Sequence, residues 1–77
     1  MEYRIKSSSL KRQLVSFEKR SSSFKTFLEE VDPEAAKVFS NTLSFAKELC
    51  SKAEERGGLI VKVGSREDRC LETLRRF

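Results

Sequence analysis

The segment Asp32-Pro33-Glu34 constrains the fold of this chain more than any other feature. A proline disfavours the helical conformation at the residue before it, so a helix usually ends on reaching one. Asp32 is a favourable N-cap residue, Pro33 suits the first helical position, and Glu34 places an acid in the first turn. One helix must therefore end near Glu30 and a second must begin at Pro33. A connection this short predicts antiparallel neighbours.

Apolar residues before this junction recur with heptad spacing, which predicts a helix over residues 9–30. The stripe consists of Leu10, Leu14, Phe17, Phe24, Leu28 and Val31, with Phe27 beside it. Ser21 occupies the one polar heptad position, within a run of three serines that favour helices poorly. We therefore expect a long helix that is weak or bent near Ser21.

Residues 33–55 are expected to form the second helix, which Gly57 and Gly58 would terminate. Its apolar stripe contains Phe39, Leu43, Ala46, Cys50 and Ala53, and a second flank contains Val38, Phe45 and Leu49. This face is wider than one packing neighbour requires, so the helix should also contact either the C-terminal segment or a second copy. We assign Phe39, Leu43, Phe45 and Leu49 to the interface of a dimer with a four-helix core.

Two short segments have the pattern of β-strands. Residues 59–63 are rich in β-branched side chains and bounded by glycines, and within the N-terminal segment 1–7 the residues Tyr3-Arg4-Ile5-Lys6 alternate apolar and basic. A lone strand cannot satisfy its backbone hydrogen bonds, so each needs a partner. Pairing the two within one chain gives the order β-α-α-β-α, and pairing across a dimer is equally allowed.

Ser65 followed by Asp68 resembles a capping box and predicts a C-terminal helix over residues 66–77. The expected fold is a mostly α single domain of residues 1–77 with a minor α+β character. Its parts are a long antiparallel helix hairpin, a short two-stranded β element and the C-terminal helix.

The length of 77 residues is close to the lower limit for a self-sufficient hydrophobic core. Two cysteines and no histidine give neither a disulfide framework nor a zinc site, so we expect no metal and no cofactor. A partner subunit then becomes the expected source of further buried area. No apolar run is long enough for a bilayer and no signal peptide is evident, so we expect a cytoplasmic protein with reduced cysteines and no membrane partner.

The chain also lacks the usual parts of an enzyme. Without histidine there is no Cys–His or Ser–His pair, and the three glycines fit no phosphate-binding loop. Pairs of acids such as Glu29-Glu30 are typical of a solvated helix surface, and both cysteines fall on apolar faces. We expect neither catalysis nor a small-molecule substrate.

Basic residues give the positive indication of function. Residues 1–25 hold seven basic and two acidic side chains. Residues 26–55 hold three basic and seven acidic ones, and residues 56–77 hold six basic and three acidic ones. Lys11, Arg12 and Lys19 lie opposite the apolar stripe of the first helix, among serine hydroxyls, and Arg66, Arg69 and Arg76 form a stripe on the last helix. Such faces suit the phosphate backbone of a nucleic acid, RNA or DNA, and a duplex more than a single strand.

A different interpretation is a non-catalytic assembly subunit, adaptor or inhibitor that binds another protein. Its contact surface would be the apolar face of the second helix or the edge of the 59–63 strand. Phosphorylation within serine clusters 7–9 and 21–23 would locally cancel the basic face in either case.

Overall fold

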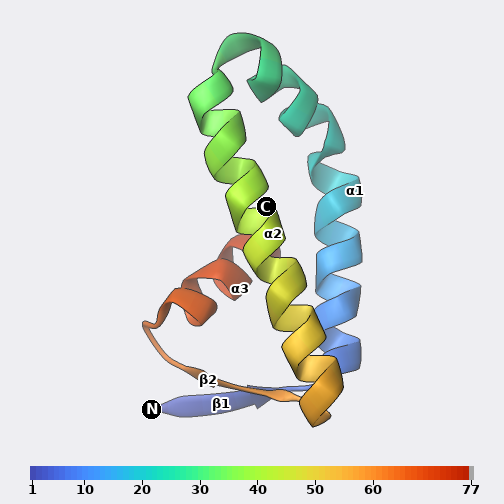
Figure 1. Ribbon diagram of the computed structural model, residues 1–77, viewed down its shortest axis with the longest axis vertical. Helices are drawn as coiled ribbons and strands as arrows, with labels where there is room; N and C mark the ends of the chain where they lie inside the picture. Colours follow the sequence, from blue (N-terminus) through green and yellow to red (C-terminus); the bar gives the residue numbers. More distant parts are fainter. Residues whose placement is uncertain (77) are drawn as a thin grey trace.

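The computed structural model describes residues 1–76 and shows a long helix hairpin standing on a small sheet (Figure 1). The elements in chain order are β1 (Glu2–Ile5), α1 (Ser7–Val31), α2 (Pro33–Arg56), β2 (Leu59–Lys62) and α3 (Arg66–Arg76). The predicted antiparallel hairpin and the β-α-α-β-α order are confirmed. Phe77, the last residue of the predicted helix 66–77, lies outside the described residues.

Asp32 forms the junction between the two long helices. Its backbone N–H donates to the Leu28 carbonyl at 2.8 Å and closes the last turn of α1. Its side chain accepts a hydrogen bond from the Ala35 N–H at 3.2 Å and caps the first turn of α2. Because one residue serves both helices, the hairpin turn is as short as the sequence predicts.

The helices differ from their predicted bounds by one or two residues at their ends. α1 begins at Ser7 rather than residue 9, because the Leu10 N–H already donates to the Lys6 carbonyl at 3.0 Å. α2 runs one residue further than predicted, to Arg56, where Gly57 adopts the left-handed conformation with φ of 72°. Ser21 does not interrupt α1, although Figure 1 shows the helix curving over its second half.

β1 and β2 pair within the chain as an antiparallel sheet, so the pairing across a dimer is not needed to satisfy their backbones. Tyr3 lies opposite Val61 and Ile5 opposite Leu59, which places these four side chains on the inner face against the core. Gly58 leads into β2 where a Cβ atom would lie only 3.2 Å from the Ile5 carbonyl oxygen. The close approach of the two strands therefore favours glycine there.

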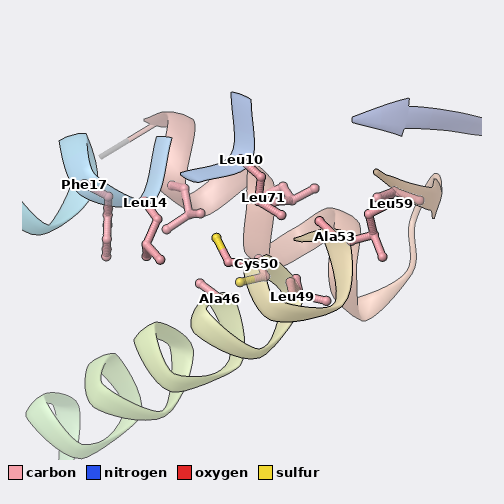
Figure 2. Close-up of a cluster of buried hydrophobic side chains, with 12 residues drawn as sticks. Leu10, Leu14, Phe17, Ala46, Leu49, Cys50, Ala53, Leu59 and Leu71 are labelled. Atoms are coloured by element: carbon pink, nitrogen blue, oxygen red, sulfur yellow. The ribbon is translucent and has the colours of Figure 1, made fainter. Parts of the chain in front are cut away.

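The hydrophobic core lies in the half of the hairpin nearest the sheet (Figure 2). It combines residues from both long helices, β2 and α3, namely Leu10, Leu14, Phe17, Ala46, Leu49, Cys50, Ala53, Leu59, Val61, Cys70, Leu71 and Leu74. We call this half of the hairpin the proximal half, and residues 21–42 around the turn the distal half. None of the helices described is long and apolar enough to cross a membrane.

Candidate binding surfaces

Lys11, Arg12 and Lys19 lie on one exposed face of α1. They line a shallow groove with Ser8, Val15 and Ser16. These six positions repeat at steps of three and four, so the groove runs along the helix itself. We call this surface the α1 basic face. It combines three cationic side chains with two hydroxyl groups.

The charges of the α1 basic face are mostly available to a ligand. Arg12 and Lys19 form no ion pair within residues 1–76, whereas Lys11 Nζ lies 3.9 Å from Glu54 Oε1. Both side chains of this pair are more than half exposed, so solvent weakens their attraction. An anion of higher charge density would compete with Glu54 for Lys11.

The three arginines predicted on the last helix are held in different ways. The Arg66 guanidinium lies 4.3 Å from the centre of the Phe45 ring, a cation–π contact. Arg76 Nη2 pairs with Glu72 Oε1 at 2.6 Å. Arg69 forms no ion pair among the described residues, and it lines a shallow surface of α3 with Glu72, Thr73 and Arg76. This surface shares no residue with the α1 basic face.

A different arginine of α3 reaches α1. The groove at the junction of the two helices is lined by Arg12, Gln13, Ser16, Arg20, Leu74 and Arg75. Arg20 donates to the Leu74 carbonyl at 2.8 Å and to the Ser16 carbonyl at 3.3 Å, so it fixes the end of α3 on α1. Spacing within α3 shows which residues share a stripe, but only the docking angle of the helix shows that Arg75 extends the α1 basic face.

The four residues predicted at a dimer interface lie mainly inside the monomer. Leu49 is a core residue with 1% of its surface exposed. Phe39, Leu43 and Phe45 are half-buried and pack against the core. α1 and α3 therefore cover most of the wide apolar face of α2, but Val38 of that face stays exposed.

A group of exposed apolar residues lies on the distal half of the hairpin. It consists of Phe24, Phe27 and Val31 of α1, exposed by 41%, 55% and 64%, and Val38 of α2, exposed by 65%. We call these four residues the distal apolar face. The Phe24 ring also meets the Phe39 ring edge-on at 6.2 Å between centroids, and Phe39 stacks on Phe17 at 5.4 Å. The aromatic contacts connect this face to the proximal core.

Beside the distal apolar face, a groove of about 250 Å³ separates α2 from α3. Its walls are Val38, Asn41, Thr42 and Phe45 on α2, and Arg66, Arg69, Cys70 and Thr73 on α3. The α2 wall has two apolar and two polar side chains, and the opposite wall carries two cations. The groove therefore joins an apolar surface to a positively charged one.

The titratable groups with shifted pKa values have structural roles. Backbone hydrogen bonding from Gly64 lowers the pKa of Asp68, and the Tyr3 hydroxyl adds to the effect. Burial raises the pKa of the Cys50 and Cys70 thiols, which keeps them protonated and unreactive. Within residues 1–76, no cluster of three or more cysteine, aspartate or glutamate side chains is suited to a metal ion.

Comparison of the chain with models of protein families, with curated proteins and with solved structures gives no match.

Proposed function

We propose that the protein is a non-catalytic binding protein whose α1 basic face contacts the phosphate backbone of a nucleic acid. The observation that supports this proposal is the grouping of Lys11, Arg12 and Lys19 with two serine hydroxyls on one open face. Lysine and arginine neutralise phosphates, and hydroxyl groups donate hydrogen bonds to phosphate oxygens. Arg75 extends the positive charge from α3.

A duplex is the preferred ligand within this proposal. Proteins that bind single strands stack the bases on exposed aromatic rings. The α1 basic face has no aromatic residue, and Phe17 of the same helix is buried in the core. A face that presents mainly charges and short hydroxyls, with Val15 as the one apolar residue in its lining, recognises the backbone rather than the base sequence.

The test is a fluorescence polarisation titration of the protein with duplex RNA, duplex DNA and single strands, each at two salt concentrations. We expect tighter binding to a duplex, with an affinity that falls steeply as salt increases. The double variant Arg12→Glu and Lys19→Glu should reduce the slope of log affinity against log salt by about 2, one for each lost contact.

The matched control reverses the same number of charges on α2, where Lys37 and Lys52 are exposed and lie outside the α1 basic face. Lys37→Glu with Lys52→Glu should leave the salt slope almost unchanged. Equal losses in the two double variants would show that only net charge matters, and an absence of binding at low salt would exclude the proposal.

A second candidate is a subunit or adaptor that binds another protein at the sheet. β2 pairs on one side with β1, and its other edge has no strand partner among the described residues. Ile60 on this strand is 67% exposed. An extended segment of another protein can add to such an edge. Co-purification of the intact protein from its native source tests this candidate, and loss of the partner on changing Ile60→Asp would place the contact at β2.

A further inference from the structure

The distal half of the hairpin extends beyond α3 and the sheet, which leaves one side of it uncovered (Figure 1). On α1, the hydrogen bond from Arg20 to Leu74 identifies the side that faces α3. Phe24, Phe27 and Val31 follow Arg20 at intervals of four, seven and eleven residues, so they continue that same side towards the turn.

The same continuation occurs on α2. Phe45 and Thr42 face α3 across the groove, and Val38 lies one turn nearer the hairpin turn on the same wall. Both long helices therefore carry apolar side chains past the end of α3, where no other element described covers them. The distal apolar face is a continuation of the α3-binding surface.

Opposite charges border the two ends of this face. Glu30, Asp32 and Glu34 surround the hairpin turn, and each is exposed. At the other end, Arg66 and Arg69 of α3 line the groove that Val38 also lines. The surface is thus acidic, then apolar, then basic along the hairpin.

We propose that a second copy of this chain covers the distal apolar face, with the two hairpins antiparallel and related by a two-fold axis near Val38. Glu34 lies one turn, about 6 Å, to the acidic side of Val38. Thr42 lies one turn to the other side, and Arg69 shares its groove. The two-fold axis would place Glu34 of each copy opposite Arg69 of the other.

The charge order favours a second copy over an unrelated protein. A two-fold interface joins identical surfaces, so it must be complementary to itself. An acidic-apolar-basic order meets this condition only when the copies are antiparallel, because a parallel pair would place acids against acids. Two hairpins arranged in this way form a four-helix layer, but through the distal half of the hairpin rather than through Leu43 and Leu49.

Burial within the monomer supports the same conclusion. Between residues 22 and 45, Ala36 is the one buried apolar residue, with 6% of its surface exposed. Because the distal half has so little core of its own, burial of its exposed phenylalanines and valines against a partner would add substantially to its stability. This proposal is independent of nucleic-acid binding, because it uses none of the residues of the α1 basic face.

The first test is sedimentation equilibrium of the intact protein and two single variants over a wide concentration range. The wild type should be a dimer in reversible equilibrium with the monomer. Val38→Asp should raise the dissociation constant by about tenfold or more, since it buries a charge in the interface. Val63→Asp, a control at an exposed apolar residue just after β2, should leave the constant unchanged. Circular dichroism establishes that each variant folds.

The second test reverses the proposed charge pair. Glu34→Arg and Arg69→Glu should each weaken the dimer, and the double variant should restore it because opposite charges face each other again. A wild type that stays monomeric at every concentration would overturn the proposal. A dimer that persists in Val38→Asp, or a double variant no better than the single ones, would overturn the antiparallel arrangement.

Discussion

The Asp68 carboxylate joins three parts of the chain. One oxygen accepts a hydrogen bond from the Tyr3 hydroxyl at 2.7 Å, and the other accepts one from the Gly64 N–H at 2.9 Å. The Asp68 N–H in turn donates to Ser65 Oγ at 3.3 Å, which confirms half of the predicted capping box. The partnership with Tyr3 was not predictable, because the two residues are 65 positions apart and meet only once β1 pairs with β2.

At this scale we predict that Tyr3→Phe lowers the free energy of unfolding by about 1 kcal/mol, the usual contribution of a hydrogen bond. The two hydrogen bonds hold the pKa of Asp68 below its ordinary value of 3.8. A lowered pKa stabilises the fold above this value, and the contribution is lost as the pH falls through the folded-state pKa. Urea unfolding of both proteins at neutral pH and below about pH 4 measures the effect.

The variant should lose less stability than the wild type on acidification, because one of the two hydrogen bonds that depress the pKa is already absent. Parallel stability curves for the two proteins would show that the Tyr3 hydroxyl does not hold the carboxylate in its charged form.

At the scale of elements, the junction at Asp32 and the apolar stripes of α1 and α2 were predictable because they rest on contacts between neighbours in the chain. The sequence did not predict which segment packs against the wide apolar face of α2. Both the C-terminal segment and a second copy fit the pattern, and the structure shows α3 there, with Arg66 on the Phe45 ring. The orientation in which α3 packs decides which of its arginines approaches α1. The spacing of residues within α3 does not predict that orientation.

Ser21 is the one polar residue in the apolar stripe of α1, and its effect on stability can be predicted. It is 3% exposed, and its hydroxyl donates to the Phe17 carbonyl at 2.6 Å. The hydrogen-bonding need of this buried hydroxyl is therefore met within the helix. That carbonyl also belongs to the helical ladder, so it does not depend on the hydroxyl. We predict that Ser21→Ala raises the free energy of unfolding by about 0.5 kcal/mol, the difference in helix propensity.

Ser22→Ala is the matched control, because Ser22 is exposed and its hydroxyl makes a similar contact with the Lys19 carbonyl. Urea unfolding should show similar gains for the two variants. A loss of more than about 1 kcal/mol that is confined to Ser21→Ala would mean that the buried hydroxyl stabilises the curvature of α1.

At the scale of the whole molecule, stability and charge are both unevenly distributed along the 38 Å length. The proximal half combines five elements in one core, whereas the distal half is held by the aromatic contacts of Phe39 and by Ala36. The separation of an acidic middle from basic ends was visible in the sequence. Its consequence, an acidic turn and a basic α3 at opposite ends of an apolar face, required the fold.

The rate of amide hydrogen exchange should differ between the two halves of the hairpin. Amides exchange when the structure opens locally, and opening is easier where few apolar contacts hold the helices together. At concentrations low enough to keep the protein monomeric, amides of residues 24–42 should exchange faster than those of residues 10–17 and 46–53. If a second copy covers the distal apolar face, a rise in concentration stabilises that half by mass action and slows exchange there selectively. Val38→Asp should keep the fast exchange at both concentrations. Uniform exchange along the hairpin would contradict the division into two halves, and slowing confined to the α1 basic face or to β2 would place the second copy on a different surface.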